Sequence, residues 1–277
     1  MDNNEIKVLD HGFVRLVDSM GDDSSIVDAA RTSYGKGTKT VNEDRGLIRY
    51  LMRMYHNTPL EMVEFKFHIK CPIFVMRQQI RHRSANVNEY SGRYSIMTDD
   101  CYVPDLDRIT KQSTNNNQGS SDEILSNAQE IQDRMKSQIQ NDMNAYHDYL
   151  DDDLAREIAR INLPLSNYTE FYWKIDLHNL FHYLRLRMDS HAQYEIRVLA
   201  EAIYELIKPI VPIACEAFED YRLNSSNMSS MELDTLRHIL FNRNISKDDI
   251  AADIQKMGQK LSKREISEFY RKLGYNE

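Results

Sequence analysis

Between Val63 and Lys70, apolar side chains alternate strictly with charged or polar ones. A period of two residues predicts a β-strand with one face buried and the other facing water. Pro72 ends this strand, and proline favours the first positions of a helix. We therefore expect a helix from Pro72 to His82, directly after the strand.

The same periodicities predict the other elements. Residues 6–18 and 168–175 are rich in β-branched and aromatic side chains, which is typical of strands, and a turn at Asp10-His11-Gly12 divides the first of them. Residues 107–123 are polar and predict a mobile surface loop. Apolar residues spaced three and four apart predict helices at 42–54 and 192–221, the latter past Pro209 and Pro212, with a break there as the alternative. Further helices are predicted at 24–34 (ended by Gly35-Lys36-Gly37) and 177–187, and one or two long helices at 122–161 (ended before Pro164).

These elements predict an α/β fold, with a small, mixed but largely antiparallel sheet flanked by long helices. After Asn224 the chain becomes a short polar linker, and brief helical patterns follow it. They have plausible starts at Ser246 and at Ser262, where Glu265 completes the spacing of a capping box. We divide the chain into residues 1–223 and a C-terminal helical extension at 224–277.

Composition narrows the classes of function. The chain holds no run of eighteen apolar residues and begins without a basic, then apolar, leader, so neither a membrane span nor a signal peptide is expected. Its three cysteines, Cys71, Cys101 and Cys215, are too widely spaced for a disulfide framework or a metal site. We expect a soluble protein of the cytoplasm. The net charge of −8 disfavours general binding of nucleic acid.

Residues 81–94, which we call the signature, contain three arginines, one histidine and one glutamate. In an acidic chain they form a local positive island. Arginine presents a planar fork of donors that matches phosphate or carboxylate oxygens. The simpler interpretation is an exposed helix end followed by a charged loop. The alternative is a binding site for a small anion.

The order of residues favours the binding site. Arg81-His82-Arg83 is followed after seven residues by Ser91, with Asn88-Glu89 before that serine and Arg93-Tyr94 after it. This pattern resembles the signature of flavin-dependent thymidylate synthases and departs from it only at Asn86, where the family has Ser. Further blocks similar to the family lie at Ala30–Ser33, His56–Glu61, Arg160–Pro164 and Leu186–Glu195, so the resemblance covers about residues 25 to 220.

The resemblance implies a methyltransferase of nucleotide biosynthesis that makes dTMP from dUMP. FAD would be its cofactor, and NADPH and methylenetetrahydrofolate its co-substrates. It further implies a catalytic domain at 1–223 and a cytoplasmic homotetramer whose active sites are shared between subunits. One alternative is a flavin- and nucleotide-binding homologue without turnover. Another is a nucleic-acid-binding protein that uses the arginine island.

None of the cysteines lies in a convincing setting for a nucleophile, and each is expected to be a small buried hydrophobe. A mechanism without a protein nucleophile is consistent with this. The resemblance implies that Arg187 lies against the uracil ring and stabilises negative charge that develops there. Without the resemblance, Arg187 would be expected in a surface ion pair with Asp189 or Glu195.

The remaining site residues are candidates for the substrate or the flavin. Ser91 is expected to hydrogen-bond the substrate, because no base is evident to activate it. Gln78 and Gln79 can read a pyrimidine edge through their amides. The substrate-binding candidates are Gln78, Gln79, Arg81, Glu89, Tyr90, Ser91, Gly92, Arg93, Arg160 and Arg187. The candidates for the flavin are His56, Thr58, Arg81, His82, Arg83, Glu89, Asp176, His178 and His182.

His178 and His182 lie four residues apart, so they share one face of a helix. Two histidines at this spacing can bind a metal, but no Cys or Glu-x-x-His partner accompanies them. A structural pair is the alternative, and the resemblance places this region at the flavin. We predict no metal site.

Overall fold

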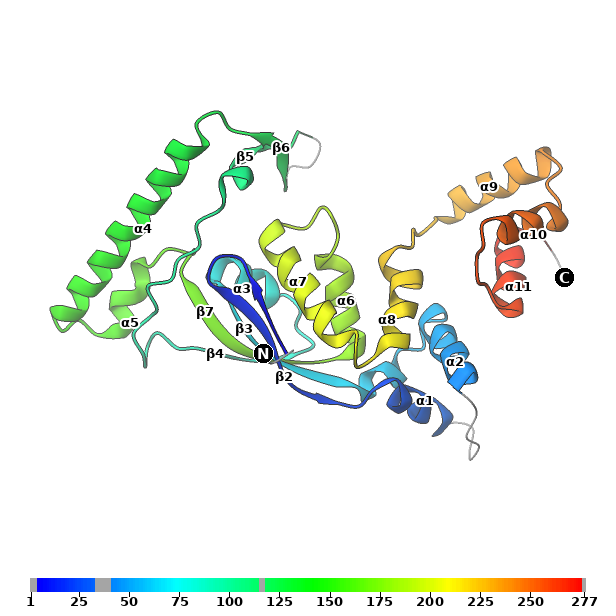
Figure 1. Ribbon diagram of the computed structural model, residues 1–277, viewed down its shortest axis with the longest axis horizontal. Coiled ribbons are helices and arrows are strands. Elements are labelled where there is room, and N and C mark those ends of the chain that lie inside the picture. Colours follow the sequence, from blue (N-terminus) through cyan, green and yellow to red (C-terminus); the bar gives the residue numbers. More distant parts are fainter. Residues whose placement is uncertain (1–3, 33–40, 115–117, 276–277) are drawn as a thin grey trace. The chain divides into compact units, whose positions relative to one another are not determined.

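The computed structural model describes residues 4–32, 41–114 and 118–275, so the predicted helix end at Gly35-Lys36-Gly37 lies outside the described residues. In this part of the chain, five antiparallel strands form one sheet in the order β1-β2-β3-β7-β4, with helices around it (Figure 1). The predicted fold class is confirmed. The strands are β1 (Glu5–Val8), β2 (Gly12–Met20), β3 (Glu64–Pro72), β4 (Asn86–Glu89) and β7 (Tyr168–Asp176).

The centre of the sheet is the pair formed by β3 and β7. They are in register over nine residues, from Glu64 opposite Asp176 to Pro72 opposite Tyr168. The alternation that predicted β3 is confirmed, because Phe65, Phe67 and Ile69 are fully buried on one face. The opposite face carries charged and polar side chains, as expected for an antiparallel sheet with one wet side.

The predicted turn at Asp10-His11-Gly12 joins β1 to β2. Its glycine is required by a close approach of backbones. A Cβ atom at Gly12 would lie 2.7 Å from the carbonyl oxygen of Val8 and 2.8 Å from that of Lys70. Any side chain there would push β2 away from β3.

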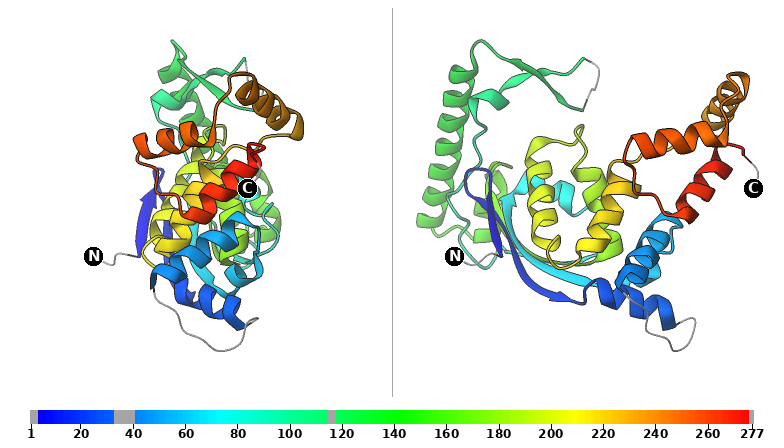
Figure 2. Two further views of the ribbon diagram at one scale, coloured as in Figure 1. Left: turned by 90° about the vertical axis from the view of Figure 1, so that its right-hand side faces the viewer. Right: turned by 45° about the vertical axis from the view of Figure 1, so that its right-hand side comes forward.

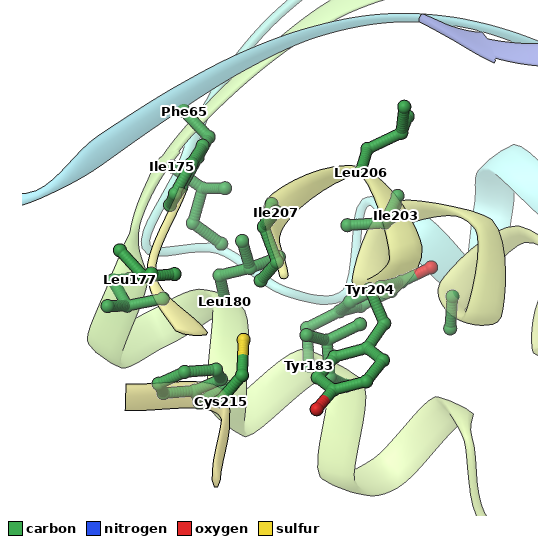
Figure 3. Packing of buried hydrophobic residues seen from close by; sticks show 14 of the residues in the cluster. Phe65, Ile175, Leu177, Leu180, Tyr183, Ile203, Tyr204, Leu206, Ile207 and Cys215 are labelled. Atoms are coloured by element: carbon green, nitrogen blue, oxygen red, sulfur yellow. The ribbon is translucent and has the colours of Figure 1, made fainter. Parts of the chain in front are cut away.

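Helices α6 (Leu177–Arg187) and α7 (Tyr194–Ile207) cover the apolar face of the sheet. Figure 3 shows buried side chains of both helices, with Leu180 and Ile207 on the side of the cluster where Phe65 and Ile175 lie. The chain does not continue as one helix past the prolines: α7 ends at Ile207 and α8 (Pro212–Phe218) begins at the second proline. Proline lacks the N–H that a continuing helix needs. Helices α1 (Asp23–Thr32) and α2 (Val41–Arg53) complete this layer and match their predicted positions.

Residues 107–123 are not a plain loop, which corrects the prediction. They contain a short 3-10 helix (Leu106–Arg108) and a two-stranded hairpin of β5 (Thr110–Gln112) and β6 (Ser120–Ile124). The sequence pattern did not predict this hairpin, because its strands are short, polar and largely exposed. Helix α4 (Ala128–Asp151) consequently begins later than the expected residue 122, and the predicted span holds two helices, because the short helix α5 (Arg156–Ala159) is separate from it.

A second, smaller core holds α4 in place. Met97 and Cys101 pack there against Met143 and Tyr146 of α4. The hydroxyl of Tyr146 accepts a hydrogen bond from the backbone N–H of Met97 at 3.0 Å. Figure 2 shows α4 (green) with the β5–β6 hairpin near its N-terminal end.

The signature also differs from its expected form. Helix α3 spans Ile73–Gln79 and ends before the signature, and Arg81–Arg83 follow in a turn. Residues Asn86–Glu89 then form β4, an edge strand paired with β7, where a loop was expected. All four side chains of β4 are exposed, so no apolar alternation marks the strand in the sequence.

The chain divides into two compact units, Met1–Asn224 and Ser225–Glu277. The second unit contains α9 (Ser230–Asn242), α10 (Lys247–Lys256) and α11 (Lys263–Lys272). Capping boxes at Ser229, Ser246 and Ser262 start the three helices, which confirms the predicted starts at the latter two. Across the described ranges, no helix combines the length and the apolar character needed to cross a membrane.

The two-unit division generates a prediction for a shortened chain. Among the described residues of the second unit, Leu273 is the one buried apolar side chain, so this unit contributes little core of its own. We expect a chain ending at Asn224 to remain folded and to bind the flavin that the resemblance implies. Calorimetry and the visible spectrum of the flavin-reconstituted protein measure this. Loss of soluble protein would show that residues 225–277 are needed for folding or assembly.

Candidate functional site

The candidate site is built around the junction between β7 and α6, which follow one another without a loop. Asp176 is the N-cap of α6. Its carboxylate accepts the backbone N–H of Asn179 at 3.0 Å and the side-chain Nδ2–H of the same residue at 2.7 Å. Such a cap satisfies donors that the first turn leaves free. Asp176 thus has a structural role here, and its assignment to the flavin stays a prediction.

One face of α6 and the start of the signature enclose a cleft of about 420 Å³, which we call the Arg187 cleft. Asn179, His182 and Leu186 lie three and four residues apart on α6, so they share this face. Arg81, His82, Arg83 and Ser84 form the opposite side. The structure therefore brings together the first half of the signature and the predicted catalytic arginine, although about a hundred residues separate them.

Within the Arg187 cleft, Nε–H of Arg187 donates a hydrogen bond to Nε2 of His82 at 3.1 Å. Arginine has donors and no acceptor, so Nε2 of His82 must carry the lone pair and Nδ1 the proton. Burial and the adjacent Arg187 guanidinium lower the pKa of His82 from 6.5 to about 4, and His182 adds to this. At neutral pH the cleft thus holds an arginine cation beside a neutral imidazole.

The ion pairs expected for Arg187 without the resemblance are not formed in the described residues. Asp189 instead accepts hydrogen bonds from the backbone N–H and the ring of His191, at 2.8 and 2.9 Å. Glu195 is buried and accepts the hydroxyl of Tyr102 at 3.0 Å. The two terminal NH₂ groups of the Arg187 guanidinium have no acceptor in the described part of the chain. They are therefore available to hydrogen-bond a ligand.

His182 also lines a second, smaller pocket of about 90 Å³. His178 and His182 line it together with Asn57, whose side-chain oxygen is buried and finds no donor among the described residues. Two arginines also reach it, Arg185 from α6 and Arg222, which stacks on the ring of Tyr55 at 3.6 Å. The pocket offers donors and positive charge, which suit an anionic or carbonyl-rich ligand.

The second half of the signature lines a separate cleft of about 450 Å³, which we call the Arg160 cleft. Arg160, at the start of a short 3-10 helix, lies there with the run from Glu89 to Arg93. A Cβ atom on Gly92 would lie 2.8 Å from Sδ of Met97 and 3.0 Å from Cδ of Arg160. The glycine therefore allows Arg160 to lie close against the signature backbone.

Three hydrogen bonds involve residues in the wall of the Arg160 cleft. Glu89 accepts the hydroxyl of Thr169 from β7 at 2.8 Å, and the hydroxyl of Tyr90 donates to the carbonyl of Ile96 at 2.7 Å. Ser91 uses its hydroxyl oxygen to accept the backbone N–H of Arg93 at 3.3 Å. These three hydrogen bonds restrain the conformation of the loop after β4. They thereby restrain the polar side chains of this loop that line the Arg160 cleft.

Several predicted site residues lie away from these clefts. Gln79 is fully buried, and both polar atoms of its amide lack a partner among the described residues. Gln78 is half-buried just before the signature, and its Nε2 donates to Oε1 of Gln193. His56 and Thr58 are exposed and line none of the three cavities, although their neighbours Tyr55 and Asn57 line the small pocket. Their assigned roles stay predictions.

The three cysteines are free and buried. Burial raises the pKa of the Cys71 thiol far above its usual range, raises that of Cys101, and raises that of Cys215 to about 12. A thiol rather than a thiolate is present at neutral pH, and thiols are poor nucleophiles. No group of three or more His, Cys, Asp or Glu side chains suited to a metal ion occurs in the described ranges.

Sequence reasoning missed several residues that line the cavities. Asn179 and Arg185 continue the helical stripes of His182 and His178, and that spacing could have found them. Asn57 lies inside a block already noted, and its unsatisfied oxygen is visible only in three dimensions. Arg222 comes from a single π-helical turn at Glu219–Leu223, for which the sequence gives no signal.

Comparison with known proteins decides the family. The family model described as thymidylate synthase complementing protein matches residues 15–213. The chain belongs to the flavin-dependent thymidylate synthase family. A relative of that name from Wolbachia pipientis wMel is 51% identical over 259 residues, which cover 93% of this chain and 91% of the relative. Another from Dictyostelium discoideum is 53% identical, with 84% of this chain and 80% of the relative covered.

Solved structures agree with this family assignment. The UMP/dUMP methylase PolB from Streptomyces cacaoi, bound with 5-Br dUMP, has a TM-score of 0.72 and 31% identity to this chain. The match covers 80% of this chain and all of PolB. The same methylase bound with 5-Br UMP has a TM-score of 0.71. The shared part corresponds in length to the first unit, which holds all three cavities.

The Arg187–His82 pair leads to a prediction about pH. Because the pKa of His82 is lowered in the folded state, the unfolded chain binds the proton first, and this residue's contribution to stability is present above pH 6.5. It declines as the pH falls from 6.5 towards 4. We expect NMR titration of the His82 ring to give a pKa near 4, and Arg187→Leu to raise it partway towards 6.5.

The matched control for this titration is Arg185→Leu, which removes the same charge from the same helix. Arg185 lines the small pocket and is not among the groups that shift His82. His82→Gln identifies the resonance by removing it. A His82 pKa that is ordinary in the unmodified protein, or unchanged by Arg187→Leu, would contradict the pairing of these two side chains.

Proposed function

We propose that the protein makes dTMP by reductive methylation of dUMP, with methylenetetrahydrofolate as carbon donor and with FAD and NADPH as the source of hydride. The observation that supports this most is the Arg187 cleft. There the predicted catalytic arginine is hydrogen-bonded to the signature in a chain of this family. The PolB structures, whose ligands are halogenated dUMP and UMP, support a uridine nucleotide as the substrate class.

Arg187 would act as the electrostatic catalyst. It is always protonated, so it cannot serve as a base, but its free fork can stabilise negative charge on a uracil oxygen or nitrogen. The neutral His82 holds this fork by accepting from Nε without adding charge of its own. A preorganised donor in a site that excludes water is worth ~3 kcal/mol of the activation free energy.

The Arg160 cleft is the proposed place for the phosphate of dUMP. Arg160 and Arg93 both line it, and two guanidinium forks can bind phosphate oxygens in pairs. Arg93 contacts Glu157 at 3.4 Å between two exposed side chains. Such a pair is weak in water, so an incoming phosphate can replace it. Ser91 and Tyr90, on the same wall, supply hydroxyl groups for the nucleotide.

The residues fit a flavin dinucleotide along the Arg187 cleft and the small pocket. Arg81 and Arg83 are exposed, and their guanidinium groups have no partner in the described part of the chain, which suits a diphosphate. His178, His182 and the buried oxygen of Asn57 would supply hydrogen-bonding groups to the rest of the flavin dinucleotide. When bound, the reduced flavin supplies the hydride. The buried thiols agree with chemistry in which no cysteine attacks the ring.

A cytoplasmic homotetramer with shared active sites is part of the proposal. The division of the signature between two clefts supports it, because one chain presents two half-sites. The three free thiols agree with a reducing compartment.

The first test follows the visible spectrum of the reconstituted protein without oxygen. We expect a flavin spectrum that NADPH bleaches and that recovers when dUMP and methylenetetrahydrofolate are added, with dTMP formed. Arg187→Ala should keep the flavin spectrum and lose dTMP formation by about 10²- to 10³-fold, the effect of one preorganised donor. NADPH oxidation without dTMP would favour the homologue without turnover.

The second test asks whether active sites are shared. Arg187→Ala and Arg93→Ala each impair one half-site, so each alone should make dTMP far more slowly than the unmodified protein. If a site takes its halves from different subunits, refolding or co-expressing the two variants together should restore part of the activity. Mixed tetramers are isolated with two affinity tags. Activity that stays absent in verified mixed assemblies would show that both arginines serve the same site from one chain.

A further inference from the structure

Two local departures from regular backbone accompany Arg222, which lines the small pocket. A single π-helical turn at Glu219–Leu223 follows α8, and the backbone N–H of Asn224 donates to the carbonyl of Glu219 at 3.0 Å. The stacking partner of Arg222 is Tyr55, which has a positive φ of 62° just after α2. Positive φ is uncommon for a residue other than glycine. Both kinds of departure occur frequently at functional sites.

Two contacts fix the side chain of Arg222 in the wall of the pocket. Its guanidinium stacks on the ring of Tyr55, with Cζ 3.6 Å from the ring centroid. One of its terminal nitrogens donates to the carbonyl of Met52 at 2.9 Å. A guanidinium that is already held in place loses little conformational freedom when a ligand binds, so it is a preorganised donor.

The small pocket has an excess of positive and donor groups. Of the nine described residues that line it, two are Arg, two are His and none is Asp or Glu. Arg185 forms no hydrogen bond or ion pair within the described part of the chain. Burial lowers the pKa of Arg222; Tyr55 raises this pKa, and the Arg185 cation lowers it. The two cations thus repel one another, and an anion bound beside both would relieve that repulsion.

The size and the donors of the pocket suit a phosphate group. Its volume is about 90 Å³, against about 420 and 450 Å³ for the two clefts, so it accommodates one compact group. A phosphate group presents several oxygens to several donors, and arginine forks bind such oxygens in pairs. His182 lines both this pocket and the Arg187 cleft, so a molecule in that cleft can extend one of its groups into the pocket.

We propose that the small pocket binds one phosphate group of a dinucleotide through Arg185 and Arg222. This inference rests on the proposed function, which brings two dinucleotides to the protein and gives these two arginines no role. Arg222 also lies beyond residues 15–213, which the family model matches. The phosphate belongs either to FAD or to NADPH, whose 2′-phosphate is the group that NADH lacks.

Calorimetry distinguishes these two sources. Titration of FAD into the flavin-free protein measures the Kd of the flavin. Titration of NADP⁺ and of NAD⁺ into the flavin-loaded protein gives two constants whose ratio isolates the 2′-phosphate. R185M and R222M each remove one charge, and R222K keeps the charge but loses the fork. R134M is the matched control, because Arg134 is exposed on α4 and lines none of the three cavities.

We expect R185M and R222M each to weaken binding by about 10- to 100-fold, the size of a hydrogen bond to a charged group. If the phosphate is that of FAD, the Kd of FAD rises and the ratio for NADP⁺ and NAD⁺ stays unchanged. If it is the 2′-phosphate, the Kd of FAD stays unchanged and the preference for NADP⁺ falls. R222K should keep part of the affinity, and R134M should match the unmodified protein.

The double variant R185M/R222M tests whether both arginines hold the same group. Its loss of affinity should be smaller than the product of the two single losses, because contacts to one group depend on each other. The thermal midpoint of each variant is the control for folding. Arg185 is exposed, so R185M decides the matter if R222M loses stability.

Two outcomes would overturn the inference and leave the proposed function intact. One is dTMP formation with an unchanged Kd for FAD and an unchanged nucleotide ratio in both R185M and R222M. The other is an equal loss of affinity in R134M, which would show an effect of overall charge. Failure of the proposed function looks different: the protein would bind FAD or NADP⁺ through these arginines and form no dTMP, and the inference would stand.

Discussion

The arrangement of the site depends on the junction at Asp176, where β7 becomes α6 without a loop. β7 pairs with β3 on one side and with β4 on the other, so it fixes the signature strand by backbone hydrogen bonds. The same strand then passes directly into α6, which carries Arg187 on its last turn. The carboxylate of Asp176 caps this helix and sets where its first turn begins. A shift of one residue here would rotate every functional side chain on α6 by ~100°, which follows from 3.6 residues per turn.

Electrostatics complements this geometry. The protein carries a net charge of −8, yet it places several arginines around two neighbouring clefts. A positive island in an acidic protein draws a small anion to one place and avoids general attraction for polyanions. Burial adds a second effect, because it keeps His82 neutral beside Arg187. The positive charge of this pair is therefore carried by Arg187, and arginine stays protonated at physiological pH. His82 accepts the hydrogen bond from Arg187 and carries no charge.

Much of this structure could be predicted from the sequence, and the failures have identifiable causes. Strand β3 and helix α6 were predicted within a residue or two, because burial of one face leaves a clear period in the chain. Strand β4 and the β5–β6 hairpin were missed, because their pairing uses backbone groups and their side chains are exposed. Backbone pairing of this kind leaves no pattern in the order of side chains.

In the site, too, features that depend on neighbouring residues could be predicted, and features that depend on tertiary packing could not. The signature was found as a string, and its first half does meet Arg187 in space. The capping role of Asp176 was missed, although Asp directly before a helical stripe is an ordinary N-cap signal. The burial of Gln79 and the contact between Gln78 and Gln193 could not be foreseen, since both depend on how α3 and α7 pack.

The geometry of β4 also explains why one signature serves two clefts. Its four residues are extended and span ~13 Å at about 3.3 Å each. Arg83 before the strand and Glu89 at its end therefore lie too far apart to bind the same small group. The arginines before β4 face the Arg187 cleft, and Arg93 after it faces the Arg160 cleft. A ligand that meets both must be long, or the two halves must belong to different sites. In either case the edge strand acts as a spacer, and its length sets the distance between the two groups of arginines.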